Sequence, residues 1–190
     1  FAGDFFTLLV FWEVMAVASA VLIFKGRFRT SQSAGLRYLY FHLLGGSLLL
    51  GGIVMHLNSS SSLALLAFTD PTSVGAWLVL LGVMINAAIP PFHAWLPDSY
   101  PKASVTGAVF LSALTTKSSV YILLRLFPGW DLLIYLGVIM ALYGVVYAVL
   151  ANDIRKILGY HIISQVGYMV TGAGLGTTMA INGAAAHAFS

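Results

Sequence analysis

The sequence predicts an all-α, polytopic integral membrane protein, a helix bundle in which prolines break one helix. Of its 190 residues, 59% are hydrophobic and only 8% are charged, whereas a soluble domain carries about 25% charged residues. Long apolar runs alternate with short polar breaks along the chain, and the pair Pro90–Pro91 interrupts one of these runs. We interpret residues 1–190 as one transmembrane domain, and we expect both ends to be cut from a longer protein.

Six membrane crossings and the start of a seventh follow from the apolar runs. The crossings lie near residues 5–24, 38–57, 74–97, 104–124, 132–150 and 157–176, and the seventh helix begins near 179. At about 1.5 Å of rise per residue, a run of this length covers a hydrocarbon core of about 30 Å. Turn-forming or charged segments separate the runs, in order "KGRFRTSQSAG", "NSSSS…TDPTS", "PDSYPK", "PGWD" and "NDIRK". The run at 157–176 is rich in glycine and has the weakest helical signal.

The positions of the basic residues give an independent test of this topology. When the crossings alternate in direction, seven basic residues fall on one side, namely Lys25, Arg27, Arg29, Arg37, Lys102, Arg155 and Lys156. Only Arg125 falls on the other side, and Lys117 lies within a helix. Basic loops face the cytoplasm or the matrix. We therefore predict a multi-pass protein of the cell (inner) membrane, embedded in lipid, whose first helix runs from outside to inside.

Glu13 and Lys117 are the charged residues that fall deep inside predicted helices. Such groups are costly in a membrane and usually face the bundle interior or a water-filled path. Two structural alternatives remain open. Glu13 could be a hydrogen-bonded carboxyl that stays neutral, and Lys117 could extend its long side chain to the interface. The serines and threonines around Lys117 favour hydrated protein over lipid.

The third crossing contains "VMINAAIPPFHAWLPD". Its two prolines remove backbone donors and free carbonyl groups near Ile85 and Asn86, which a membrane protein tolerates where the backbone is buried or lines a cavity. His93 follows the break, and a neutral imidazole can pass protons at physiological pH. The alternative is a kink that serves only packing, with His93 and Trp95 as an interfacial anchor.

His161 and His187 add titratable groups on later helices and are weaker candidates for a proton path; His42 and His56 are weaker still. The five histidines are scattered over four of the predicted segments, which argues against a metal site. The chain has no cysteine and no phosphate-binding or dinucleotide-binding motif. We predict no catalytic residue, no cofactor and no metal in this chain, and no nucleic-acid partner.

The stretch "PPFHAWLPDSYPKASVTGAVFLSALTTKSSVYILLRL" resembles a known family, the antiporter-like subunits of respiratory complex I, membrane-bound hydrogenases and Mrp-type Na⁺/H⁺ antiporters. "FFTLLVFWE" and "DIRKILGYHIISQVGYM" match the same family in the right order. The segment "INAAIPPFHAWLPDSYPKASVTG" is most similar to the D-type subunit of Mrp antiporters. The resemblance implies the central part of a subunit of about fourteen helices, built from two inverted repeats that would be incomplete here.

The resemblance also implies roles for individual residues. In the family, a glutamate of the fifth helix pairs with a lysine of the seventh, and a lysine or histidine of the eighth continues the path. Glu13 and Lys117 match the first and the third of these, and His187 matches a histidine of the eleventh helix. Asn86 stands where the family has the lysine, so the sequence departs from the usual Glu–Lys pair.

These features predict a proton-conducting membrane transporter subunit, most similar to the D-type subunit of Mrp antiporters. Its expected ions are H⁺ and, in exchange for it, Na⁺. The expected proton path comprises Glu13, Asn86, His93, Lys117, and the weaker His161 and His187. Two alternatives stay open: the proton-pumping subunit of an NADH:quinone oxidoreductase or a membrane-bound hydrogenase, and a structural or energising subunit of an inorganic-carbon uptake system. The chain is not expected to be a catalyst by itself, but it could belong to a redox-driven proton translocase. Its expected partners are other membrane subunits.

Overall fold

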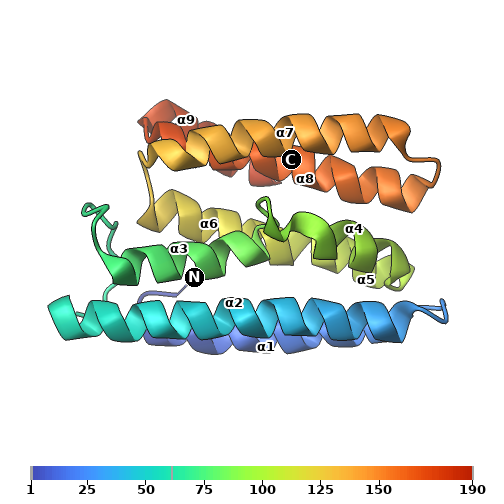
Figure 1. Ribbon diagram of the computed structural model, residues 1–190, viewed down its shortest axis with the longest axis horizontal. Coiled ribbons are helices and arrows are strands. Elements are labelled where there is room, and N and C mark those ends of the chain that lie inside the picture. Colours follow the sequence, from blue (N-terminus) through green and yellow to red (C-terminus); the bar gives the residue numbers. More distant parts are fainter. Residues whose placement is uncertain (1, 61, 190) are drawn as a thin grey trace.

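The computed structural model describes residues 2–60 and 62–189, so Ser61 of the predicted serine loop lies outside the described residues. The described chain is a bundle of helices (Figure 1). The α-helices are α1 (Phe5–Phe24), α2 (Ser31–Ser60), α3 (Val74–Asn86), α4 (Trp95–Ser99), α5 (Val105–Phe110), α6 (Thr116–Leu126), α7 (Asp131–Leu150), α8 (Ile154–Leu175) and α9 (Thr178–Phe189). Two short 3₁₀ turns, Phe92–Ala94 and Tyr100–Lys102, flank α4, and a π-helical turn, Leu111–Thr115, joins α5 to α6.

The observed helices correspond to the predicted runs, with two informative differences. Helix α2 begins at Ser31, where the sequence predicted 38, because this polar first turn is held inside the protein: the buried Ser31 donates a hydrogen bond to the Lys102 carbonyl at 2.8 Å. Helix α3 ends at Asn86 instead of continuing to 97. The proline pair lies just beyond that end, and short turns complete the segment.

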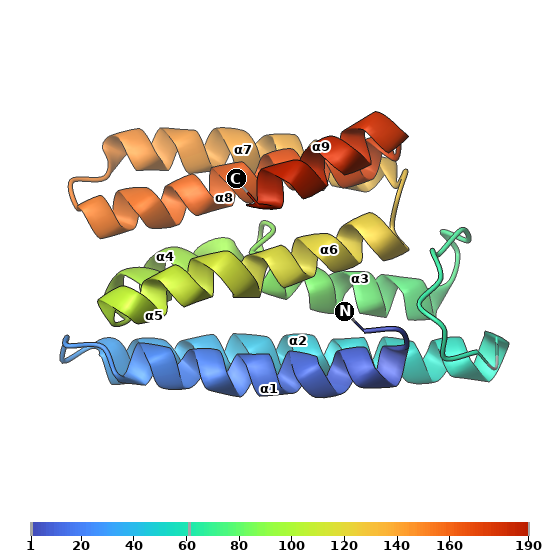
Figure 2. The ribbon, with the colours of Figure 1, turned by 180° about the vertical axis from the view of Figure 1, so that it is seen from behind.

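The helices lie in three groups, which Figures 1 and 2 show from opposite sides. Helices α1 and α2 form one side of the bundle, α3 to α6 form the middle, and α7 to α9 form the other side. The middle group therefore supplies much of the buried core, including Leu80, Trp95 and Leu123. The predicted all-α membrane bundle with a discontinuous helix is confirmed.

Glycines bring neighbouring helices into close contact. A Cβ atom added to Gly52 of α2 would lie 2.6 Å from the backbone nitrogen of Val79 in α3. One added to Gly82 of α3 would lie 2.6 Å from the carbonyl oxygen of Gly45 in α2. Small residues allow this approach of backbones, which is how helices associate in membranes without a hydrophobic driving force. Gly45 and Gly52 of α2 thus form the contact with α3.

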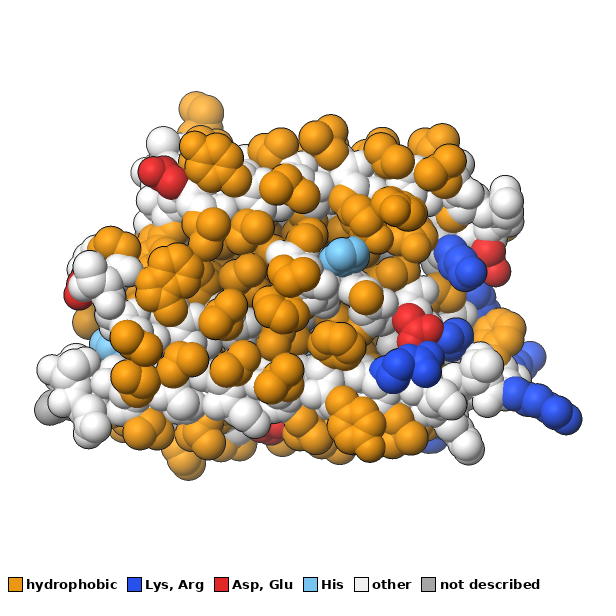
Figure 3. All heavy atoms as spheres, in the orientation of Figure 1, with side chains coloured by type: hydrophobic (Ala, Val, Ile, Leu, Met, Phe, Trp, Pro, Cys, Tyr) orange, Lys and Arg blue, Asp and Glu red, His pale blue; other side chains and the backbone are white. Residues whose placement is uncertain are grey.

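Four described helical segments are long and apolar enough to cross a membrane: Phe5–Phe24, Ser31–Ser60, Val105–Leu126 and Asp131–Leu150. The apolar helix Val74–Asn86 is shorter. Hydrophobic side chains cover most of the molecule in Figure 3, and the lysines and arginines visible there gather at one end. This surface fits a lipid environment along the sides and water at the ends, so the protein is a multi-pass membrane protein.

Ion pairs and hydrogen bonds tie the segments together at that basic end. Arg37 at the start of α2 forms an ion pair of 2.6 Å with Asp98 of α4, and Lys102 pairs with the same carboxylate at 2.5 Å. Arg155 of α8 donates hydrogen bonds to the carbonyls of Pro101 and Ala103. The connections α1–α2, α4–α5 and α7–α8 therefore meet at one end of the bundle.

Candidate functional site

Glu13 lies near the middle of α1 and is half-buried. Its carboxyl group lies against Gly46 of α2, so close that Glu13 Oε1 occupies the space a Cβ at position 46 would need. Helix α1 carries no other charged residue. A carboxyl group at this depth is costly unless polar groups or water surround it. The α1–α2 contact is therefore built around the carboxyl, with glycine supplying the room.

Asn86 ends α3 at the break. It is only 1% exposed, and neither its amide nitrogen nor its amide oxygen has a hydrogen-bond partner among the described residues. Ala88, two residues later, takes a left-handed backbone conformation with φ of 55°. The carbonyl of Ile85, one of those expected to be freed, accepts a hydrogen bond of 2.8 Å from Trp95 Nε1. The break is therefore packed inside the protein. Trp95 replaces one of the backbone hydrogen bonds that the break removes, since it donates to the Ile85 carbonyl.

Trp95 is 1% exposed and lies in the core, so it is not the interfacial anchor that one interpretation of this segment suggested. His93 is half-buried, and its ring meets that of Tyr143 in α7 edge to face, with centroids 4.4 Å apart. Its Nδ1 is buried without a hydrogen-bond partner among the described residues. His93 thus faces the α7 side of the bundle, and no hydrogen bond joins its Nδ1 to Asn86.

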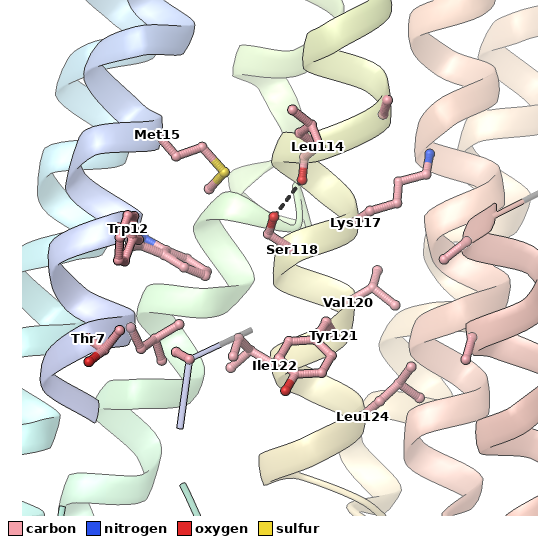
Figure 4. Close-up of a pocket in the computed structure, with 16 residues that line it drawn as sticks. Thr7, Trp12, Met15, Leu114, Lys117, Ser118, Val120, Tyr121, Ile122 and Leu124 are labelled. Atoms are coloured by element: carbon pink, nitrogen blue, oxygen red, sulfur yellow. Dashed lines mark hydrogen bonds between the residues drawn. The ribbon is translucent and has the colours of Figure 1, made fainter. Parts of the chain in front are cut away.

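Lys117 lies in the first turn of α6, directly after the π-helical turn, and is half-buried. It lines a pocket of about 550 Å³ together with Trp12, Ser118 and Tyr121. Figure 4 shows that its side chain extends away from α1, on which Trp12 lies. Glu13 is not among the residues that line this pocket. The two charged candidates therefore face different spaces.

His161 and His187 lie on the outer part of the bundle, in α8 and α9, and both are exposed in this chain. A hydrogen bond of 2.5 Å joins His187 Nε2 to Gln165 Oε1 of α8. His161 precedes Gln165 by one helical turn and so shares its face of α8. These three residues form a separate polar row along α8 and the end of α9, in which the bond between His187 and Gln165 joins the two helices.

The structure adds a residue to which the sequence interpretation gave little weight. His42 of α2 is 1% exposed, and its Nε2 has no hydrogen-bond partner among the described residues. Its ring lies 3.9 Å from that of Tyr38 and 4.6 Å from that of Trp95, centroid to centroid. The spacing Tyr38, His42, Gly46 places all three on one face of α2, and this periodicity in "YLYFHLLGG" is the signal that could have identified it.

A small polar cluster adjoins this face nearer the basic end. Ser19 of α1 and Thr115 of the π-helical turn are hydrogen-bonded at 3.2 Å. The Tyr38 hydroxyl adjoins both but makes no hydrogen bond to any described residue. All three residues are buried. The hydroxyl of the nearby Tyr100 donates to the Leu111 carbonyl at 2.9 Å. Hydroxyl groups from α1, α2 and the π-helical turn thus converge inside the bundle.

Comparison with known proteins assigns the family. Residues 2–190 match the family model described as NADH:quinone oxidoreductase/Mrp antiporter, TM. The chain is 34% identical to the D-type subunit of the Na⁺/H⁺ antiporter of Alkalihalophilus pseudofirmus, over 96% of this chain and 41% of that protein. It is 32% identical to the N-type subunit of the NADH-quinone oxidoreductase of Desulforudis audaxviator, over 99% of this chain and 41% of that protein.

Solved structures give the same result. A chain of the Mrp complex from Dietzia sp. DQ12-45-1b aligns with a TM-score of 0.86 at 30% identity, over 98% of this chain and 39% of that one. A chain of an archaeal membrane-bound sulfane sulfur reductase aligns with a TM-score of 0.89 at 26% identity, over 100% of this chain and 42% of that one. The chain thus spans about two fifths of the length of the relatives it matches. It belongs to the NADH:quinone oxidoreductase/Mrp antiporter transmembrane family.

Proposed function

We propose that this chain forms a proton-conducting part of an antiporter-like membrane subunit. The observation that carries the proposal is a set of buried side-chain polar atoms without hydrogen-bond partners among the described residues. They lie on Trp12, Tyr38, His42, Asn86, His93, Thr116 and Ser164. These residues come from α1, α2, α3, α6, α8 and the broken segment.

Each such atom would cost about 1–3 kcal/mol if it stayed unpaired in a dry interior. A bundle that served only as a structural support would more readily place apolar residues at these positions. Water entering between the helices would satisfy the polar atoms and would also provide a route for protons. Half-buried Glu13 and Lys117 fit the same interpretation, since each can hold or release a proton beside such water.

In the proposed path Glu13 is the gating carboxyl, Asn86 contributes a neutral amide at the break, and Lys117 is the central relay base. The polar row of His161, Gln165 and His187 would continue the path on the α8–α9 side. His93 faces α7. Of the two candidates in the broken segment, Asn86 and His93, it is therefore the weaker. Proton movement would follow changes in the charge or hydration around Glu13 and Lys117.

Within this family we infer a subunit of an Mrp-type Na⁺/H⁺ antiporter, similar to the D-type subunit. The identity of 34% to an antiporter subunit of that type and the likeness to a chain of an Mrp complex support this choice. The second candidate is the proton-pumping subunit of a redox complex, favoured by the 32% identity to the NADH-quinone oxidoreductase subunit and by the likeness to a chain of a sulfane sulfur reductase. In either case the partners would be other membrane subunits.

Lys117 provides the test of proton conduction. In the full-length subunit within its native complex, Lys117→Ala should abolish proton transport into membrane vesicles without loss of assembly. Lys117→Arg should restore it only partly, because arginine does not release its proton in proteins. Assembly is followed by the yield of the purified complex, and transport by a pH-sensitive dye. Wild-type transport by assembled Lys117→Ala would contradict the relay role.

The same vesicles separate the two candidates. Proton movement that follows an imposed Na⁺ gradient, without any electron donor, supports the antiporter. Proton movement that requires NADH or another reductant supports the redox complex.

A further inference from the structure

His42 is a titratable group in the centre of the bundle that has no role in the proposed path of Glu13 and Lys117. It is 1% exposed, and its Nε2 is buried without a hydrogen-bond partner among the described residues. A histidine that serves only packing usually satisfies its ring nitrogens, because an unpaired buried polar atom costs stability. The unpaired Nε2 therefore points to a function beyond packing.

The neighbours of His42 fix its ring in place. The Tyr38 ring packs against it in a tilted arrangement, with centroids 3.9 Å apart, and Trp95 meets it nearly edge to face, with an interplanar angle of 73°. Trp95 is itself held by its hydrogen bond to the Ile85 carbonyl at the helix break. The imidazole is thus oriented by the broken segment, and a shift of that segment would move the ring.

Two polar groups flank the imidazole across neighbouring helices. The Asn86 amide of α3 is a polar neighbour of the His42 ring. No hydrogen bond joins the two side chains. On the α1 side, the Glu13 carboxyl lies against Gly46, and Gly46 follows His42 by one helical turn on the same face of α2. His42 therefore lies one turn of α2 from the site of the mid-membrane carboxyl.

In the opposite direction along α2, the same face leads toward the basic end. Tyr38 precedes His42 by one turn. Its hydroxyl adjoins Ser19 and Thr115 without a hydrogen bond to either, and those two residues are hydrogen-bonded to each other. Hydroxyl groups can donate and accept together and so can pass a proton. The buried polar groups of this face thus run from the hydroxyl cluster through His42 to Glu13.

We propose that His42 is the proton-relay residue that connects Glu13 with the basic end of the bundle through the Tyr38–Ser19–Thr115 cluster. The inference rests on the proposed proton conduction. In one transfer, Glu13 gives its proton to Nε2 through an intervening water, which leaves a carboxylate beside an imidazolium. The imidazolium then releases one proton toward the hydroxyl cluster and returns to the neutral form. Asn86 adds a neutral amide beside the imidazole that does not compete for the proton.

The experiment compares two substitutions at position 42 with a matched control on the same helix. His42→Gln and His42→Asn both keep polar atoms at this position but remove the titratable group, and asparagine has the shorter side chain. If one variant does not assemble, the other remains informative. His56→Gln is the control. His56 is half-buried near the C-terminal end of α2, away from the basic end, and it is hydrogen-bonded to Ser60. Each variant is made in the full-length subunit within its native complex, and transport is measured per assembled complex.

We expect both position-42 variants to lose at least tenfold in proton transport, a change of about 1.4 kcal/mol in the barrier, while His56→Gln keeps the wild-type rate. Asn86→Lys added to His42→Gln should restore part of the lost transport, because it returns a titratable group to the same space; a packing role would give no such rescue. Wild-type transport by either assembled variant would overturn the proposal for His42. Absence of proton transport in the wild-type complex would instead contradict the proposed function itself, before any variant is considered.

Discussion

Gly46 shows how a single residue determines where a charged group can lie. A Cβ at this position would collide with Glu13 Oε1, the flexible end of a side chain, and not with backbone. The carboxyl can turn aside, so an added methyl group would displace the carboxyl while the two helices stay in place. By contrast, a Cβ at Gly51 on the same helix would meet only Leu78 Cδ1, at 3.9 Å. The two glycines therefore form a matched pair.

We predict that Gly46→Ala reduces proton transport at least severalfold, because it moves the Glu13 carboxyl away from the α1–α2 contact. Gly51→Ala should leave transport unchanged. Both variants should keep a thermal stability close to that of the wild type, measured by the loss of folded complex on heating. Equal transport in the two variants would show that the position of the carboxyl does not matter.

At the scale of helices, the Asp98 carboxylate ties α2 to α4 at the basic end. Arg37 Nε donates to Asp98 Oδ2 at 2.8 Å, and Lys102 pairs with the other oxygen. Burial alone would raise the pKa of Asp98, but hydrogen bonds and charges from Lys102 and Arg37 outweigh it and lower the pKa. A carboxyl with a lowered folded-state pKa adds stability above its unfolded pKa of about 3.9, and this contribution disappears as the pH falls through the folded-state pKa.

We therefore expect Asp98→Asn to lower the thermal stability of the complex at pH 7, through a weaker contact between α2 and α4. The difference from the wild type should shrink as the pH is lowered below about 4, where the wild-type carboxyl also becomes neutral. Melting curves at a series of pH values measure this. Because the group is partly exposed, the effect at pH 7 should be of the order of 1 kcal/mol. A difference that persists unchanged at low pH would point to lost packing instead of lost charge.

At the scale of the whole molecule, the two ends of the bundle differ in charge. The α1–α2 and α7–α8 connections lie at the basic end, and the end of α2 with Ser59 lies at the other (Figure 1). At that other end Arg125 donates hydrogen bonds to the carbonyls of Leu65 and Ala2. By the positive-inside rule, we expect the basic end to face the cytoplasm or matrix.

The chain contains no cysteine, so single substitutions report the orientation directly. We predict that Arg29→Cys and Lys156→Cys react with an impermeant thiol reagent only from the cytoplasmic or matrix side, and Ser59→Cys only from the opposite side. Right-side-out and inverted membrane vesicles provide the two sides. Labelling of all three positions from one side would contradict the predicted topology of six crossings.

Much of the architecture could be predicted from composition and run length. The helices lie over the predicted runs because about twenty apolar residues in succession have few alternatives in a membrane. The break at Pro90–Pro91 was equally visible, since proline cannot continue the backbone hydrogen bonds. The extra turns at the start of α2 were missed, because they depend on a hydrogen bond from Ser31 to the distant Lys102 carbonyl.

The sequence by itself determined that this is a membrane helix bundle with a broken helix, a mid-span glutamate and a lysine within a helix. Only the tertiary structure decided which faces of the helices meet. A membrane helix is apolar all round, because lipid is as apolar as the protein core, so its sequence shows no face that must turn inward. For this reason the contact of Glu13 with Gly46 and that of His93 with Tyr143 could be learned only from the packed helices.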